Sequence, residues 1–509
     1  MTPATRGRKK NGFAILVTVA SIMMVIPIVG LAIDAGFLYA VKARLSAATD
    51  AAAIAAGRSL SKGLTISEQE TTAQNRARAF FEANFPAGYF NTIQRNTTVT
   101  VAETAYRTRT VFVETSAEVG LFFMRIFGRD SSTIRAQGRA SRRDVNIMLV
   151  LDRSGSMDNS GSCQPMIEAA KEFVDKFANG RDRLGLVTFG MTYLLAFSPS
   201  QDFKPALPEI IDGIDCSGGT GTAQALWKGY EQLEAINEPS TLNLIVFFTD
   251  GLPNGITAAF PVKHRTDTRY GYGVSPYSST SSAYSMEPST CVDANGEKFD
   301  RRPWQSSRTY YAPNWNPNWN PQPKVGALAG AGSGTASTGY TFGVTYTEAA
   351  SLTNHRETPI ADSSGCQFAV SWSRVRRDIA YIPEQDIYGN STRGYAGNPY
   401  EFTSGTYAGH IRPDRPVNIG IVSKNAADNA ARRIRTDPDL PAVIYAIGLG
   451  EPNGGEPPDE DFMKRVANDP DSPAYDEDET TGLYVFAPDK GQLAQAFYRV
   501  ASEILRISQ

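Results

Sequence analysis

The sequence contains little cysteine and little histidine, and this scarcity limits the metal and acid–base chemistry that it can support. Four cysteines and three histidines occur among 509 residues. No two cysteines have the C-x-x-C spacing that is typical of zinc ribbons. The histidines, His264, His355 and His410, lie far apart in a polar part of the chain. We therefore expect no zinc centre, and we interpret the histidines as loop residues.

Cysteine is absent from the first 162 residues. The four cysteines are Cys163, Cys216, Cys291 and Cys366. An even number confined to the later part of a chain suits two disulfides in an oxidising compartment. Four buried thiols in a cytosolic protein are the alternative.

Excess positive charge is also absent. The chain has 50 lysines and arginines against 53 acidic residues, a formal net charge of -3. Nothing in this balance indicates bulk binding of nucleic acid, so we expect no nucleic-acid partner. The hydrophobic share of 41% and the charged share of 20% are ordinary for a globular protein. The length allows more than one domain.

One segment, residues 13–33, lacks charged side chains altogether and is close to the length that spans a bilayer. The basic string RGRKK, residues 6–10, precedes it. Because positive flanks stay in the cytoplasm, we expect a single-pass anchor with a cytoplasmic N-terminus and the bulk of the chain outside the cytoplasm. A cleaved signal peptide is the alternative, but no A-x-A site precedes the next charges. Gly12-Phe13 hints at prepilin cleavage, although Val17 stands where prepilins have glutamate.

The apolar segment continues without proline into a helix-favouring stretch with a stripe of small and aliphatic residues. The stripe comprises Leu38, Val41, Leu45, Ala48, Ala52 and Ala55. It either covers its own domain or packs against a partner helix. The whole pattern resembles the N-terminal module of TadE/TadG-like proteins, which belong to bacterial tight-adherence (Tad) pilus systems. The matching positions are Gly12, Pro27, Gly30, Asp34, Gly36, Leu38, Tyr39, Leu45, Ala48, Asp50, Ala51 and Ala52, with Ser46 near the usual glutamine. The resemblance covers roughly residues 1–60 and, with the tail, defines a first region over residues 1–62.

Residues 63–143 predict a small α+β region. Thr65-Ile-Ser-Glu68 is a capping box that should open a helix ending near Phe85, before Pro86. Three β-branched or alternating runs follow, and we interpret them as strands. They cover residues 97–104, 108–123 and 132–142.

From residue 144 onward, continuous apolar strands alternate with helices. This alternation predicts an α/β fold, with a mostly parallel sheet and helices on both faces. Strands are expected at residues 145–151, 183–189, 191–197, 242–248, 442–449 and 483–487. Helices are expected at residues 165–178, 222–235, 423–435, 459–467 and 492–505. Ligands of such sheets bind at the carboxyl ends of the strands, where the strand order reverses.

Polar residues stand at two of these carboxyl ends. Asp152, Ser154 and Ser156 follow the first strand, and Asp250 follows the strand at residues 242–248. Thr220 lies at a loop-to-helix junction between them. Hydroxyl and carboxylate oxygens are hard ligands, so a magnesium-like ion is favoured over zinc. An open coordination position would accept an acidic side chain from a protein partner.

This arrangement resembles the von Willebrand factor A (vWA) domain, a Rossmann-like doubly wound fold, and its metal-ion-dependent adhesion site. The resemblance implies that Ser154 and Ser156 ligate Mg²⁺, or another divalent cation such as Mn²⁺ or Ca²⁺, directly. It implies that Thr220 does so directly or through water. Asp152 and Asp250 hold coordinated waters, or ligate directly in some states. A vWA fold with an unused site is the alternative.

Enzymatic use of the two serines is not expected. The string RSGSM lacks a G-x-S-x-G elbow, and the expected core contains no histidine. We therefore interpret the domain as a binding module, and a hydrolase is the less favoured alternative.

A compact vWA domain needs only a short connection after Gly251, yet the next expected helix begins near Ser423. We therefore place an insertion at about residues 252–416, within a domain of residues 144–509. Thirteen of the 22 tyrosines fall in it, among many Ser, Gly, Asn and Pro residues. Aromatic residues on polar loops are typical of recognition surfaces. A loosely folded insertion is the alternative.

Position along the chain suggests a disulfide pairing. Cys163 and Cys216 both flank the candidate metal loops, so we prefer the pair Cys163–Cys216, with Cys291–Cys366 inside the insertion, among three possible pairings. The acidic run at residues 469–479 does not have the spacing of an EF-hand, and we expect a solvated loop there.

The two resemblances together are the layout of TadG-like pilus-assembly proteins. They imply a bacterial inner-membrane protein with a periplasmic C-terminal domain, which binds and scaffolds through a metal-dependent contact. Its partners would be a protein that supplies an acidic residue, other pilus-assembly proteins, and the lipid bilayer around residues 13–33. A surface-exposed adhesin that binds a host or matrix ligand through the insertion is the alternative.

Overall fold

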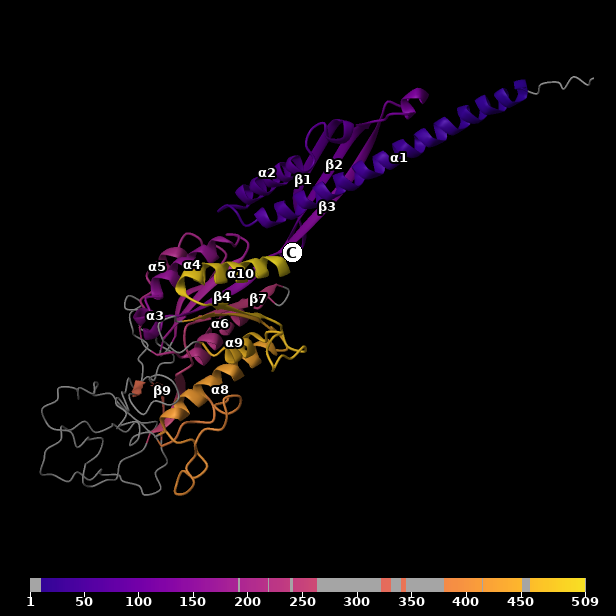
Figure 1. The fold of residues 1–509 in the computed structure, drawn as a ribbon. Helices are drawn as coiled ribbons and strands as arrows, with labels where there is room; N and C mark the ends of the chain where they lie inside the picture. The colour runs from indigo at the N-terminus through magenta and orange to yellow at the C-terminus, as the bar shows by residue number, and fades with distance from the viewer. Residues whose placement is uncertain are drawn as a thin grey trace, which may run out of the picture. The chain divides into compact units, whose positions relative to one another are not determined.

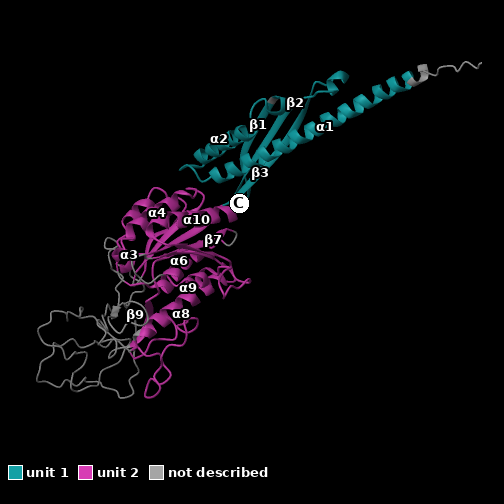
Figure 2. Cartoon of the chain, viewed as in Figure 1, with its two compact units in different colours: residues 1–143, 509 teal, residues 144–508 magenta. Residues whose placement is uncertain are grey.

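The chain forms two compact units, which divide between Arg143 and Asp144 (Figure 2). Each unit has its own hydrophobic core. The computed structural model describes residues 11–190, 193–217, 219–238, 241–262, 322–330, 340–344, 380–413, 415–450 and 458–508. Cys291, Cys366, His264, His355 and most of the aromatic insertion lie outside these residues.

The first unit is a three-stranded antiparallel sheet covered by helices. Its elements are α1 (Asn11–Ser59), α2 (Ile66–Asn84), η1 (Tyr89–Asn91), β1 (Thr92–Ala105), β2 (Thr108–Gly120), η2 (Met124–Phe127) and β3 (Ser131–Arg143), with strand order β1-β2-β3. The predicted capping box is confirmed. The Thr65 hydroxyl accepts a hydrogen bond from the Glu68 backbone N–H at 3.3 Å. In return, the Glu68 carboxylate accepts a hydrogen bond from the Thr65 backbone N–H, also at 3.3 Å.

Helix α1 has two halves with opposite surroundings (Figure 1). In the first half, the side chains between residues 15 and 33 are almost all exposed, and the helix is long and apolar enough there to cross a membrane. In the second half, the small-residue stripe is buried against α2 and the sheet of the same unit. The hydroxyls of Thr49 and Thr115 meet at 2.6 Å across this contact. The stripe therefore covers its own domain, and the alternative of a partner helix was wrong.

The second unit is built on a six-stranded sheet with the order β12-β11-β7-β4-β5-β6. Its strands are β4 (Val145–Asp152), β5 (Arg183–Phe189), β6 (Tyr193–Ser200), β7 (Leu242–Thr249), β11 (Val443–Leu449) and β12 (Leu483–Ala487). Every pair is parallel except β5 with β6, which is the antiparallel edge. Strands β4 and β7 are buried along nearly their whole length, and this explains why their sequences are continuous apolar runs. This confirms the predicted doubly wound, mostly parallel sheet.

Helices cover both faces of this sheet (Figure 1). One core is formed with α4 (Cys163–Asp175), α5 (Leu207–Asp212) and α10 (Leu493–Ile507). The other is formed with α6 (Thr222–Ile236), α8 (Pro416–Arg435) and α9 (Glu460–Ala467). Helix α8 begins seven residues before the predicted start at Ser423, because Pro416 is suited to the first turn of a helix.

The ends of the insertion are built into the core of the second unit. Strand β8 (Gly255–Val262) pairs with β9 (Gln322–Gly330), which pairs with β10 (Tyr340–Val344). The side chains of Ile256, Phe260, Leu328, Ile382 and Ile411 are fully buried or nearly so in the core that contains α6 and α8. The described parts of the insertion therefore stabilise the domain as well as extending it.

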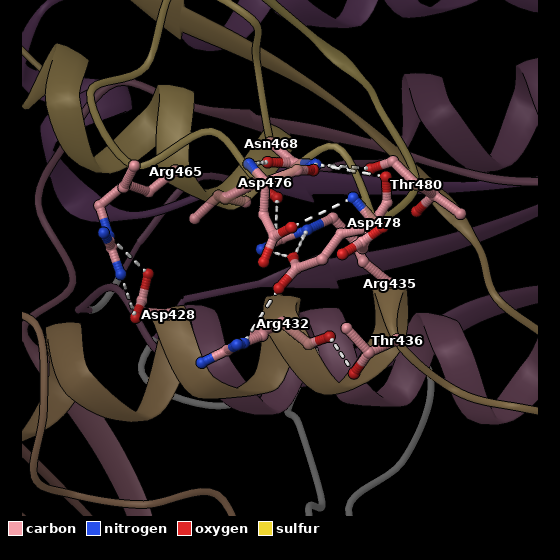
Figure 3. A network of polar contacts seen from close by, with 12 residues as sticks. Asp428, Arg432, Arg435, Thr436, Arg465, Asn468, Asp476, Asp478 and Thr480 are labelled. Atoms are coloured by element: carbon pink, nitrogen blue, oxygen red, sulfur yellow. Dashed lines mark hydrogen bonds and ion pairs between the residues drawn. The ribbon is translucent and has the colours of Figure 1, made fainter.

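A network of ion pairs lies at the amino-terminal ends of the parallel strands, just before the chain enters β11 and β12 (Figure 3). The buried Glu479 carboxylate accepts hydrogen bonds from Arg435, at 2.7 and 2.9 Å, and from Arg432, at 3.0 Å. Asp428 accepts two from Arg465, at 2.9 and 3.0 Å. The expectation of a solvated loop at residues 469–479 was therefore wrong at its ends, because arginines from α8 neutralise Glu479 and the Tyr484 N–H binds the buried Asp469.

Candidate metal site

The candidate site lies at the carboxyl ends of β4 and β7, which are neighbours in the sheet. Strand β4 ends at Asp152 and β7 ends at Thr249. The chain leaves β4 for β5 on one side and later returns to β7 on the other side. The strand order therefore reverses here, at the position where open α/β sheets bind ligands.

Asp152, the last residue of β4, is completely buried. One of its carboxylate oxygens accepts a hydrogen bond from the Ser154 backbone N–H at 2.7 Å, and the other accepts one from the Thr249 hydroxyl. Burial raises the pKa of Asp152 to about 6, although these hydrogen bonds and nearby Arg153 act in the opposite direction. A cation beside this carboxylate would favour its charged form.

Ser154, Ser156 and Asp250 converge beside Asp152. The two serine hydroxyls are 2.9 Å apart, and the Ser156 hydroxyl donates to the Asp250 carboxylate at 2.8 Å. The Ser154 hydroxyl lies 3.5 Å from the same Asp250 oxygen. Helix α3 (Gly155–Asn159) starts between the serines, so that their alternating positions bring both hydroxyls to one side. Four of the five predicted residues are thus joined by direct hydrogen bonds.

Backbone hydrogen bonds connect Thr220 to the segment that follows β7. Its N–H donates to the Asn254 side-chain oxygen at 2.7 Å, and its carbonyl accepts from the N–H groups of Asn254 and Gly255 at 3.0 and 3.1 Å. Thr220 is buried, two residues before the start of α6. The loop that carries Thr220 is therefore held to the segment that follows Asp250.

A disulfide joins the start of α4 to the loop that carries Thr220. Cys163, the first residue of α4, is bonded to Cys216, which is the pairing preferred from the sequence. The Ser217 N–H also donates to the Arg153 carbonyl at 2.6 Å. The loop after β4 and the loop before α6 are therefore connected by one covalent bond and one hydrogen bond.

Two residues with a clear part in this geometry were not singled out in the sequence. Thr249 orients Asp152, and Asn254 holds the Thr220 loop. Thr249 directly precedes Asp250 at the end of an apolar strand, which was a usable signal. Asn254 gave no signal, because its role depends on a contact 34 residues away along the chain.

The donor set fits a hard divalent cation. It consists of hydroxyl and carboxylate oxygens, which Mg²⁺, Mn²⁺ and Ca²⁺ prefer. Among the described residues, no three His, Cys, Asp or Glu side chains gather into a metal-binding group. A cation held here would therefore rely on two carboxylates and on neutral hydroxyls.

Family comparisons agree with this architecture. Residues 147–252 match the von Willebrand factor type A domain, and residues 12–59 match the Flp pilus-assembly TadE/G-like family. This chain joins a TadE/G-like segment to a von Willebrand factor type A domain. The vWA match contains all five candidate metal ligands, from Asp152 to Asp250.

Matches to individual proteins are partial. The calcium-activated chloride channel regulator 3A-1 of Mus musculus is 31% identical over 131 residues, which are 25% of this chain and 14% of that protein. The E3 ubiquitin-protein ligase WAV3 of Arabidopsis thaliana is 29% identical over 150 residues, which are 29% of this chain and 19% of that protein. The chain thus spans less than a fifth of the length of either relative.

Solved vWA structures are similar at low identity. The vWF domain of the type V pili tip protein Mfa5 from Porphyromonas gingivalis has a TM-score of 0.34 at 14% identity, over 73% of this chain and 98% of that one. The pilus adhesin SpaC from Lactobacillus rhamnosus GG has a TM-score of 0.32 at 12% identity, over 81% and 35%. Likenesses of this size do not align individual site residues.

Proposed function

We propose that this protein is a membrane-anchored component of a bacterial Tad-type pilus assembly or adhesion system, and that its vWA domain binds a protein partner through a divalent cation. The supporting observation is the convergence of the Ser154, Ser156 and Asp250 oxygens at the switch point of the sheet. The TadE/G-like match over residues 12–59 supports the assignment to a pilus system.

In this proposal, each side chain has a defined part. The hydroxyls of Ser154, Ser156 and Thr220 would hold Mg²⁺ or a similar ion, and the carboxylates of Asp152 and Asp250 would support it. When bound, the cation supplies an electrophilic position that can accept a carboxylate oxygen from the partner. Neutral hydroxyl ligands suit this role, because they leave more of the positive charge of the ion uncompensated than carboxylates would.

The proposed location follows from α1. Residues 13–33 would span the inner membrane as a single pass. The basic residues before position 11 would stay in the cytoplasm, and the vWA domain would lie in the periplasm. The Cys163–Cys216 disulfide supports an oxidising compartment for this domain.

Direct titration with Mn²⁺ tests the metal site. The detergent-solubilised full chain, stripped with EDTA, is expected to bind one Mn²⁺ ion in isothermal titration calorimetry. Ser156→Ala removes a proposed ligand and is expected to weaken binding strongly. Ser160→Ala is the matched control, because Ser160 lies in the same segment but bonds to Met157 and Ser162 instead. Its affinity should equal that of the parent chain.

The partner contact is tested next with the same chains. A partner captured in the presence of Mg²⁺ should be released by EDTA and lost with Ser156→Ala. Absence of Mn²⁺ binding in the parent chain, or equal binding by the Ser156→Ala chain, would refute the metal-dependent mechanism. If the partner stays bound in EDTA, the partner must bind to another surface of the protein, without the metal.

A further inference from the structure

The connection between β2 and β3 exposes large apolar side chains. Phe122, Ile126 and Phe127 are 54%, 75% and 59% exposed, and they flank or belong to η2. Phe90 and Ile93 are exposed at the same end of the sheet, where β1 begins and β2 ends. We call these five residues the apolar end of the first unit. Such a group of exposed apolar side chains is unusual for a surface in water.

A buried carboxylate fastens this connection to α1. Asp34 is 1% exposed, and it accepts hydrogen bonds from three consecutive backbone N–H groups. These come from Phe122 and Phe123 at 3.0 Å, and from Met124 at 2.8 Å. The Phe122 ring also packs edge-on against Phe37, with centroids 5.2 Å apart. The loop is therefore held rigidly at one level of α1.

That level is the last turn of the apolar segment. Asp34 directly follows residue 33, and Phe123 lies against Gly30. The contact is so close that a Cβ atom on Gly30 would stand 2.7 Å from that of Phe123. Glycine is needed at this position because any side chain would displace the loop. If residues 13–33 span a bilayer, the loop must therefore lie in the headgroup region.

The composition of the loop suits that region. Its apolar side chains are exposed, and so are Arg125, which pairs with Asp130 at 3.4 Å, and Arg129 in the same segment. Apolar groups that enter the boundary of the acyl chains, with cations at the phosphates, are typical of interfacial membrane binding. We infer that the apolar end of the first unit is a second membrane contact, which inserts into the outer leaflet of the anchoring membrane around α1. This inference rests on the proposed membrane anchor.

The other end of the same sheet provides an internal contrast. Tyr106 lies in the turn between β1 and β2 and is 64% exposed. The adjoining Arg109 donates to the Leu60 carbonyl at the end of the buried half of α1. With a rise of 1.5 Å per residue, Leu60 lies about 40 Å along the helix from Asp34. Tyr106 should therefore remain in water when the apolar end is in lipid.

Tryptophan fluorescence in vesicles tests the contact. Full-length Ile126→Trp and Tyr106→Trp chains are reconstituted in phosphatidylethanolamine–phosphatidylglycerol vesicles, with or without lipids brominated near the headgroup end of the acyl chains. The fluorescence of the unsubstituted chain is subtracted. The Ile126→Trp chain is expected to lose most of its added fluorescence to the brominated lipid, and the Tyr106→Trp chain almost none.

A second substitution tests the role of Asp34 as a positioning residue. Asp34→Ala, added to Ile126→Trp, removes the acceptor of three loop N–H groups and should reduce the quenching clearly. Asp50→Ala is the matched control, because Asp50 is an exposed aspartate on the same helix. It should leave the quenching unchanged.

The outcomes separate this inference from the anchor itself. If alkaline carbonate extracts the parent chain from the vesicles, both the anchor and the second contact are refuted. If the chain stays in the membrane while the Ile126→Trp signal is unquenched, or is quenched no more than that of Tyr106→Trp, only the second contact is refuted. Quenching of the Ile126→Trp chain alone, weakened by Asp34→Ala, supports the inference.

Discussion

Glu479, at the amino-terminal ends of the parallel strands (the amino edge), is held in a different way from Asp152 and Asp250, at the carboxyl-terminal ends (the carboxyl edge). At the amino edge, Glu479 is neutralised by Arg435 and Arg432. At the carboxyl edge, Asp152 and Asp250 receive hydrogen bonds from serine and threonine hydroxyls and from a backbone N–H. A guanidinium is a permanent counter-charge, whereas hydroxyls carry no net charge. Glu479 is thus neutralised by ion pairs, whereas the direct hydrogen-bond donors to Asp152 and Asp250 are uncharged groups, with Arg153 near Asp152.

The largest expected effect comes from removing the permanent counter-charge. Arg435→Met leaves the Glu479 carboxylate buried with only the more exposed Arg432, and should lower the free energy of unfolding by about 3–5 kcal/mol. Urea denaturation of the full chain in detergent measures it. Lys171→Ala is the control, because Lys171 and Asp212 form an exposed pair that should contribute less than about 1 kcal/mol. The double change Arg435→Met and Glu479→Leu should recover part of the loss. Equal effects of Arg435→Met and Lys171→Ala would show that the amino edge is not specially stabilised.

The next effect concerns the covalent link at the carboxyl edge. Replacing both Cys163 and Cys216 with serine opens a disulfide between residues 53 positions apart. The unfolded state then gains conformational freedom, so the free energy of unfolding should fall by about 2–4 kcal/mol. The same urea experiment measures this, and mass spectrometry after alkylation verifies which thiols are free. An unchanged unfolding midpoint would mean that the neighbouring hydrogen bonds hold the edge without the disulfide.

The smallest expected effect is a pH dependence of the free energy of unfolding that comes from Asp386. The carboxylate of Asp386 is buried and accepts hydrogen bonds from backbone N–H groups and from the Asn390 side chain. Burial raises its pKa to about 6. Because this value exceeds the unfolded value of about 4, the native state binds the extra proton and the free energy of unfolding should fall as pH rises through this interval. The loss is at most about 3 kcal/mol. Asp386→Asn should reduce this dependence in urea denaturation between pH values of about 4 and about 7, and the part that comes from Asp152, whose pKa burial also raises to about 6, should remain.

Glu477→Gln, at an exposed carboxylate, is the control for the pH measurement. Its unfolding should retain the pH dependence of the parent chain. A parent chain whose stability rises steadily over the same interval would contradict the direction predicted for Asp386. That result would mean that hydrogen bonds, together with the nearby Arg433, are enough to keep this buried carboxylate charged.

Local sequence patterns were sufficient for most of the fold and for the candidate site. The continuous apolar runs before Asp152 and Asp250 predicted β4 and β7, because strands buried on both faces have no polar alternation. The capping box predicted the start of α2 at the correct residue. The alternating Asp152, Ser154 and Ser156 predicted a cluster of oxygens at the end of β4, since strand ends in parallel sheets meet at one edge.

Contacts between distant residues could not be predicted in this way. The burial of Glu479 was missed because its arginine partners come from α8, more than 40 residues earlier. The strands inside the insertion were missed because Ser, Gly and Asn dominate their surroundings. Asn254 was missed because only the folded chain brings it to Thr220.

The sequence by itself determined the uncharged segment at residues 13–33, the alternation of strands and helices, and which oxygen-bearing residues follow β4 and β7. These depend on periodicity and on residue type within short stretches. Only the tertiary structure decided that the stripe on α1 covers its own sheet, and that Asp34 holds a loop 88 residues away beside the last turn of the apolar segment. The physical reason is that a buried polar group takes whichever partner the packing places within hydrogen-bond distance, and sequence separation does not limit that choice.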